Sequence, residues 1–212
     1  MPTILFFLAT LTYWGLTIYA WIIIIAILVS WVHPDPRNPL IQFLNNMTVP
    51  VWNRLQTALP PSLKLFSAYI SLLLVWFLRI FVPGMLGTFG SYSAGDVAFA
   101  QVPGIIVGFF LLGLGQITWS LLSFLILLLL IWFCLTLINP SVNNPIVRVI
   151  FMLVDPLITP IQRRLPRQRI DLSPLLAAGV FLLLNVLVVS QVVQFAAGLT
   201  QGGGVATLLR AF

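Results

Sequence analysis

Residues that could carry out chemistry are few in this chain of 212 residues. It has one histidine, His33, one cysteine, Cys134, four aspartates and no glutamate. A zinc site needs three or four Cys, His or carboxylate ligands, and a haem axial pair would need a second histidine from another chain. The sequence also has no Gly-rich phosphate loop, no nucleophile elbow and no paired carboxylates. We therefore expect no enzymatic activity, no metal site and no cofactor.

A second group of polar residues lies inside long apolar runs. It comprises Arg79, Gln116 and Asn185, with Gln191 and Gln194 further along the chain. Polar side chains inside a membrane span are costly and mark functional positions by default. They could hydrogen-bond across helices or line a polar path, and the sequence leaves both readings open. Ionisable groups do not recur along any run, so a proton or ion pump is not expected.

The composition requires lipid as the solvent for most of the chain. It is 60% hydrophobic and only 7% charged, with a mean hydropathy of +1.11. Soluble domains average about 45–50% apolar and about 25% charged residues. The net charge of +6 could suggest nucleic-acid binding, but the Lys and Arg residues sit mostly between apolar runs. We expect an all-α integral membrane protein that does not bind nucleic acid.

Apolar runs and prolines divide the chain into elements. The long apolar runs predict four membrane spans, at about 4–31, 63–82, 110–137 and 172–195. Apolar residues at helical spacing predict interfacial amphipathic segments at 38–59, where Pro50 should kink or split the helix, and at 144–166. Between the second and third spans, 83–109 is expected to be a loop, and 196–212 a tail. Arg79 would then lie near the end of its span, where it could reach the headgroups.

The two halves of the chain resemble each other at an offset of 106 residues. Prolines recur without a gap at this offset, since Pro34, Pro39, Pro50 and Pro60 fall on Pro140, Pro145, Pro156 and Pro166. The sequence therefore predicts two tandem repeats, 1–82 and 110–195, each made of a span, an interfacial helix and a returning span. Two crossings per repeat make the repeats parallel.

The basic residues predict the orientation. Three lie between the first and second spans and five between the third and fourth: Arg37, Arg54, Lys64, Arg148, Arg163, Arg164, Arg167 and Arg169. The segment 83–109 has no Lys or Arg. The positive-inside rule places both basic connections in the cytoplasm and both termini outside.

The segment from 144 to 174 holds the most distinctive pattern. Its prolines, charged residues and capping residues stand at set spacings: Asn144, Pro145, Arg148, Asp155, Pro156, Arg163, Arg164, Asp171, Ser173 and Pro174. The pattern resembles the YggT family (also called YlmG) of small bacterial and plastid membrane proteins. The first half is a weaker copy, with Val49 in place of Asp155 and Thr57-Ala58 in place of Arg163-Arg164.

Two physical roles are expected for these residues. Asp155 before Pro156, and Ser173 before Pro174, are typical of a cap followed by proline in the first turn of a helix. Arg163 and Arg164 would stand at a helix C-terminus, where cations are favoured and can reach anionic headgroups. A ligand or partner role for Asp155, and plain orientation signals for the arginines, remain alternatives.

The resemblance implies a bacterial inner-membrane protein with a link to envelope tolerance, division or cytochrome assembly. We expect an accessory, scaffold or assembly protein that contacts a larger membrane complex or anionic lipid on the cytoplasmic face. The alternative is a small channel or transporter, and a homo-oligomer is compatible with either.

Overall fold

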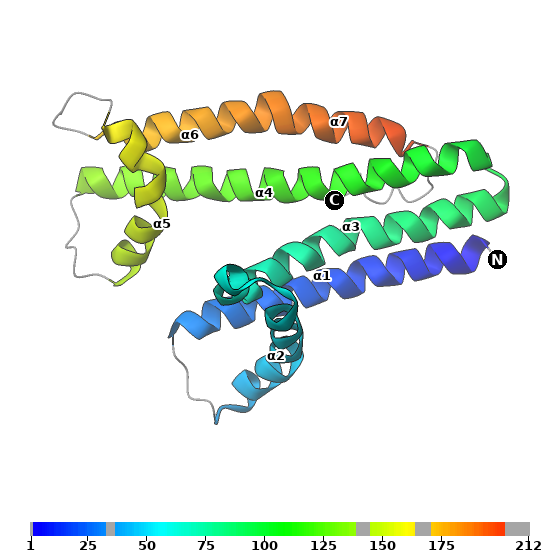
Figure 1. The fold of residues 1–212 in the computed structure, drawn as a ribbon, viewed down its shortest axis with the longest axis horizontal. Helices are drawn as coiled ribbons and strands as arrows, with labels where there is room; N and C mark the ends of the chain where they lie inside the picture. The colour runs from blue at the N-terminus through cyan, green and yellow to red at the C-terminus, as the bar shows by residue number, and fades with distance from the viewer. Residues whose placement is uncertain (1, 33–36, 139–144, 164–170, 202–212) are drawn as a thin grey trace. The chain divides into compact units, whose positions relative to one another are not determined.

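The computed structural model describes residues 2–32, 37–138, 145–163 and 171–201, and these are mostly helical (Figure 1). Four stretches are long and apolar enough to cross a membrane: Pro2–Ser30, Pro61–Ala94, Phe99–Leu137 and Ser173–Leu199. The predicted all-helical membrane fold with four spans is confirmed at this level. Its orientation in the membrane stays a prediction.

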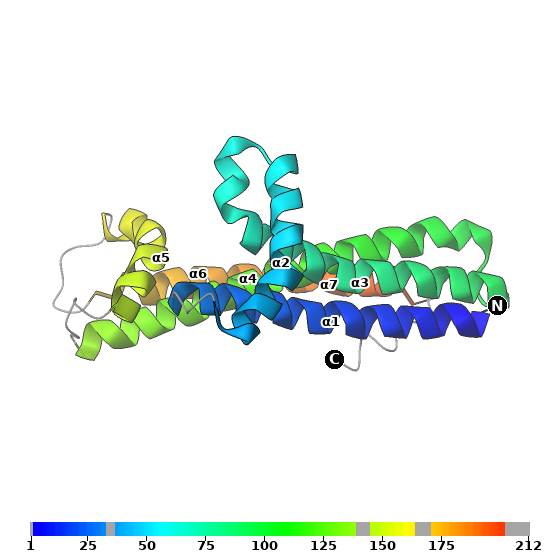
Figure 2. The same cartoon turned by 90° about the horizontal axis from the view of Figure 1, so that it is seen from below.

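The chain forms two compact units, one of residues 1–117 with 194–212, and one of residues 118–193. In the first unit, α1 (Pro2–Val32) and α3 (Ser67–Ala94) pack along each other and lie side by side in both views (Figures 1 and 2). Ala20, Ile23 and Ile27 of α1 form a buried cluster with Val75 of α3.

Helix α2 (Pro39–Ala58) follows α1 in the sequence and precedes α3, and it runs across α1 rather than along it (Figures 1 and 2). It begins at Asn38, whose side chain accepts a hydrogen bond from the Leu40 backbone N–H at 2.9 Å, and Pro39 follows in the first turn. Proline suits this position because its missing N–H would have no partner there. The helix continues through Pro50, so this proline does not split it. A short 3-10 helix, η1 (Pro61–Phe66), leads into α3.

The expected loop over 83–109 is wrong for most of its length. Helix α3 continues to Ala94 and ends at Gly95, which has a left-handed φ of 84°. After the 3-10 helix η2 (Phe99–Gln101), α4 (Val102–Ile138) begins, so the third span starts well before Phe110. Pro83 and the small residues after it are buried, with Gly84 against Phe109 of α4 and Gly90 against Leu5 and Phe6 of α1, and this packing retains the helix where their composition suggested a loop.

The second unit contains α4 from Thr118, followed by α5 (Pro145–Gln162) and α6 (Ser173–Leu184). The chain continues through a single π turn, η3 (Asn185–Val189), into α7 (Ser190–Leu199), whose last residues belong to the first unit. Helix α5 crosses α4 and α6 (Figure 1). Val154 and Ile158 of α5 are fully buried with residues of the two spans, namely Leu128, Leu129, Ala177 and Ala178. The fourth span thus extends four residues beyond the predicted end at Phe195, and the rest of the predicted tail from 202 lies outside the described residues.

Candidate functional site

The junction between α5 and α6 is organised by Asp171. Its carboxylate accepts hydrogen bonds from the Ser173 backbone N–H at 3.0 Å, from the Ser173 hydroxyl and from the Gln162 amide at the end of α5. Partial burial raises the pKa of Asp171, but the three hydrogen bonds favour the charged form and hold its pKa below the ordinary value. Asp171 therefore joins the end of α5 to the first turn of α6.

The helix caps that the sequence predicted at Ser173 and Asp155 are not the ones observed. Ser173 is the first residue of α6 and donates to Asp171, so the carboxylate, not the Ser173 hydroxyl, accepts at this helix start. Asp155 does not begin a helix either, since it lies within α5 and accepts a hydrogen bond from the Thr159 hydroxyl at 3.1 Å. Pro156 is also inside this helix. Burial of Val154 next to these residues helps to retain a helix that its prolines would weaken.

The remaining residues of the motif differ in how far they are buried. Pro174 is fully buried and Pro156 is exposed. Arg163 follows the end of α5 and is exposed, which is the predicted place for a cation at a helix C-terminus. Its backbone N–H donates to the Thr159 carbonyl. Pro145 and Arg148 lie on α5, but the structure does not describe their side chains. Asn144 and Arg164, with Arg167, Arg169 and His33, lie outside the described residues.

The first unit has a similar junction between α2 and α3. Gln56 donates a side-chain hydrogen bond to Ser67 at 3.1 Å, and the Trp52 indole N–H donates to Ser71 at 3.0 Å. Gln56 and Ser67 are 106 residues before Gln162 and Ser173. Where the second unit joins its glutamine and serine through Asp171, the first unit joins them directly.

Arg79 lies near the middle of the second candidate span, Pro61–Ala94, and not near its end as expected. Its guanidinium carbon is 5.7 Å from the ring centroid of Tyr13 on α1, and its Nε is buried without a hydrogen-bond partner among the described residues. An arginine at a span centre costs about 2.5–3.5 kcal/mol on insertion scales, and a cation–π contact returns about 0.5–2 kcal/mol. Arg79 is therefore not explained by stability alone.

Asn185 lies near the middle of the fourth candidate span, where the π turn η3 begins. Its side chain is only 3% exposed, and its Nδ2 donates to the Ser123 hydroxyl of α4 at 3.2 Å. Its Oδ1 is buried and has no hydrogen-bond partner among the described residues. π turns inside helices are frequent at functional sites. Asn185 thus has one amide atom engaged and one free acceptor.

Gln116 is exposed and forms no hydrogen bond with the described part of the chain. Gln191 and Gln194 are also exposed. Because Gln116 belongs to the first unit and Asn185 to the second, the polar path that the sequence left open is not tested. Within each unit, the polar residue of the returning span contacts the span before it, through Tyr13 for Arg79 and through Ser123 for Asn185.

Comparison with known proteins places these features in a family. The model of the CCB3/YggT family matches residues 5–86 and 111–192, together more than half of the chain. The chain belongs to the CCB3/YggT family. It is also 27% identical over 193 residues to the uncharacterized protein YggT of three Escherichia coli strains, including K12, and the match covers 87% of this chain and 88% of that protein. No solved structure matches it.

The two CCB3/YggT matches begin 106 residues apart, the offset at which the prolines recur. At this offset Arg79 corresponds to Asn185, and Gln56 and Ser67 correspond to Gln162 and Ser173. The recurrence of this Gln and Ser is the signal that could have identified the two junctions from the sequence. Tyr13 and Ser123, the partners of the mid-span polar residues, gave no such signal because they are common residue types for span interiors and ends.

Proposed function

We propose that this CCB3/YggT protein is an accessory or assembly protein that acts by binding rather than by catalysis. It would present its two interfacial helices on the cytoplasmic face of the inner membrane, and bind a larger membrane complex or anionic lipid there. The observation that carries the proposal is an apolar face of α2 that nothing in the described structure covers. Leu40, Phe43 and Met47 lie on this face at helical spacing, with 64%, 51% and 44% of their surface exposed.

The neighbouring side of α2 packs on the spans, because Leu44 and Thr48 are buried and Trp52 bonds to α3. An interfacial helix with one side fixed and an apolar second side is suited to docking on another protein or on lipid. Beyond α5, the exposed Arg163 adds positive charge for an acidic partner or for anionic headgroups.

The proposed architecture is two parallel repeats with both basic connections inside the cell. It is supported by the two family matches at one offset and by the absence of Lys and Arg from residues 83–109. Both termini would then face outward, and α2 and α5 would share one side of the membrane.

Affinity purification of the full chain from membranes in mild detergent tests this proposal. A photoreactive amino acid at position 47 should capture a distinct membrane protein or anionic lipid. Reversing Arg163 and Arg164 to Glu should reduce the recovered partner or lipid several-fold. Arg210→Glu, on the predicted opposite side, is the matched control and should leave recovery unchanged. Recovery of the chain alone, with lipid content equal in all variants, would refute the proposal.

A channel or transporter is the second candidate, favoured by the mid-span position of Arg79 and by its Nε, which has no hydrogen-bond partner among the described residues. Ion flux through purified protein in liposomes, lost on Arg79→Leu or Gln116→Leu and retained on Arg54→Leu, would support it. Liposomes that show no flux above empty vesicles would exclude it.

A further inference from the structure

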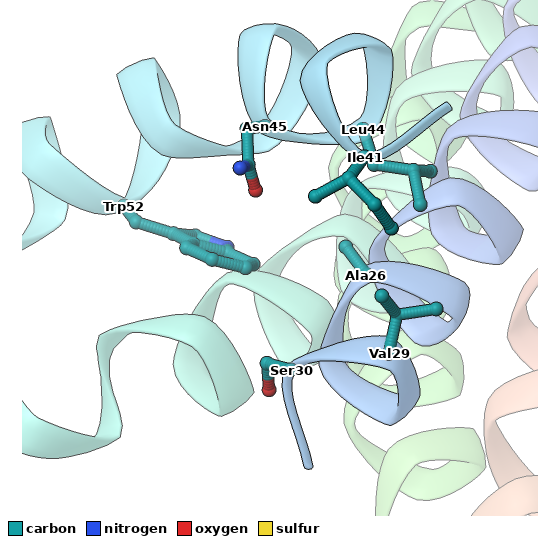
Figure 3. A pocket seen from close by; sticks show the side chains of 7 residues that line it. All are labelled: Ala26, Val29, Ser30, Ile41, Leu44, Asn45 and Trp52. Atoms are coloured by element: carbon teal, nitrogen blue, oxygen red, sulfur yellow. The ribbon is translucent and has the colours of Figure 1, made fainter. Parts of the chain in front are cut away.

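The first unit contains a cavity of about 210 Å³ between α1 and α2 (Figure 3). Its wall is mainly apolar, formed by Ala26 and Val29 of α1 and by Ile41, Leu44 and Trp52 of α2. Drug-sized ligands occupy pockets of roughly 300–1,000 Å³. This cavity is smaller, so it suits a segment of a flexible apolar chain.

One polar group in the wall is free to bind. The Ser30 hydroxyl donates to the Ile27 carbonyl at 2.7 Å, and the Trp52 indole N–H donates to Ser71 at 3.0 Å, so both donors are used. Asn45 forms no hydrogen bond with any described residue, and its amide is directed toward the Trp52 ring (Figure 3). Asn45 therefore offers a donor and an acceptor at the cavity.

The second unit has different residues at the corresponding positions. At the offset of 106 residues, Trp132 stands in place of Ala26 and Phe151 in place of Asn45. Their rings contact each other with centroids 5.3 Å apart, and Trp132 packs on the buried cluster around Val154. At the same offset Ile158 stands in place of Trp52, and Phe151 is 44% exposed, so the two units place their aromatic rings differently. In the first unit the small Ala26 and the amide of Asn45 leave a space beside Trp52 that is available to an apolar chain.

The position of the cavity identifies the chemistry of this occupant. Ala26 and Ser30 lie at the end of the first candidate span, so the cavity is at the depth where lipid chains meet their headgroups. The connection from 33 to 66 carries Arg37, Arg54 and Lys64 against a single acidic residue, Asp35. Positive charge at this depth favours anionic headgroups.

We propose that the cavity binds one acyl chain of an anionic phospholipid, with the Asn45 amide hydrogen-bonded to the ester carbonyl of the lipid. The headgroup of this lipid lies toward the basic connection. This site faces the spans and is separate from the outward apolar face of α2, so it goes beyond the proposed docking function and does not depend on it.

Photolabelling of the full chain in nanodiscs tests the site. The probe is phosphatidylglycerol with a diazirine near the ester end of one chain, and labelled peptides are mapped by mass spectrometry. Residues of α1 and α2 around the cavity should be labelled in the native chain. Ala26→Trp, which introduces the residue of the second unit, should reduce this labelling at least about fivefold.

Ile25→Trp is the matched control, because Ile25 is the neighbouring residue on the same helix and is 44% exposed. It adds the same side chain outside the cavity and should leave labelling unchanged. Asn45→Leu keeps the branched shape and the number of side-chain heavy atoms and removes one hydrogen bond, so it should reduce labelling by about fivefold or less without altering the melting temperature.

Equal labelling of the native chain and a folded Ala26→Trp variant would overturn the proposal. Equal labelling by phosphatidylcholine with the same diazirine chain would overturn the preference for an anionic lipid. Neither result would alter partner recovery by the Arg163 and Arg164 variants, so the failure of this site and the failure of the docking function are distinguishable.

Discussion

Replacement of Gly84 by alanine is the sharpest test of the packing between α3 and α4. A Cβ at Gly84 would overlap the ring of Phe109, with Cγ as its nearest atom. Phe109 is fully buried in a cluster with Ile80, Val97 and Ile105. Because Cγ is the ring atom closest to the backbone, rotation of the ring cannot relieve the overlap, and the two helices must separate.

The magnitude follows from two opposing terms. Alanine gains about 0.8–1.0 kcal/mol over glycine in helix propensity, whereas overpacking costs about 1–3 kcal/mol. The severe overlap favours the upper end, so Gly84→Ala should destabilise the protein by about 1–2 kcal/mol. For a chain of this length, this lowers the melting temperature by roughly 2–8 °C. Thermal unfolding in mild detergent, followed by tryptophan fluorescence, measures it.

Gly104→Ala is the matched control, since a Cβ there meets nothing within 4 Å, and its melting temperature should stay equal or rise. Phe109→Ala should cost less in the Gly84→Ala variant than in the native chain, because it removes Cγ and both Cδ atoms, with which the new Cβ overlaps. A Gly84→Ala variant that melts at or above the native temperature would refute the packing and favour the loop expected from the sequence.

Three further predictions concern polar groups. Asn38→Ala removes the acceptor at the start of α2, which is worth about 0.5–2 kcal/mol, so hydrogen exchange of the first-turn amides should accelerate at least about twofold. The pKa of Asp171 is lowered in the folded chain, so its stabilisation is present above the ordinary value of 3.8 and is lost as the pH falls through the folded value. The difference in melting temperature between the native chain and Asp171→Asn should therefore be largest above about pH 5 and vanish in acid; a constant difference would contradict this role. Asn185→Leu removes an amide whose Oδ1 has no partner among the described residues, so the free energy of unfolding should stay equal or rise. Ser123→Ala removes the acceptor of Nδ2 as well and should lower the free energy of unfolding by about 1 kcal/mol. A greater loss for Asn185→Leu than for Ser123→Ala would show that this amide stabilises the fold.

Much of the fold could be predicted because hydrophobic runs and prolines each have a direct structural effect. The expected interfacial segment 38–59 is α2 at Pro39–Ala58, since Asn38-Pro39 starts the helix and Pro60 follows its end. The four spans were also correctly identified by length and hydropathy. The junction between α5 and α6 was not predicted, because the hydrogen bond between Gln162 and Asp171 depends on how the two helices pack.

The main error arose from reading the segment after Pro83 by the rules for soluble proteins. Gly84, Gly87, Gly90 and Ser91 suggested a loop, but all four are buried on α3. In lipid, small residues mark the face where helices approach closely, because apolar side chains gain nothing by leaving the lipid. Their backbone groups must still be satisfied internally, which retains the helix.

The greater length of α3 changes how the position of Arg79 is interpreted. A span that ended at Val82 would let the guanidinium reach the headgroups, but a helix that continues to Ala94 holds it near mid-span. Asn185, which lies 106 residues after Arg79, is also near the middle of its candidate span, and each of the two side chains has a buried polar atom without a partner in the described structure. Chance placement of an unsatisfied group is disfavoured by its desolvation cost, and that cost applies separately to the two positions. Neither Arg79 nor Asn185 is therefore explained by the stability of its own helix pair alone.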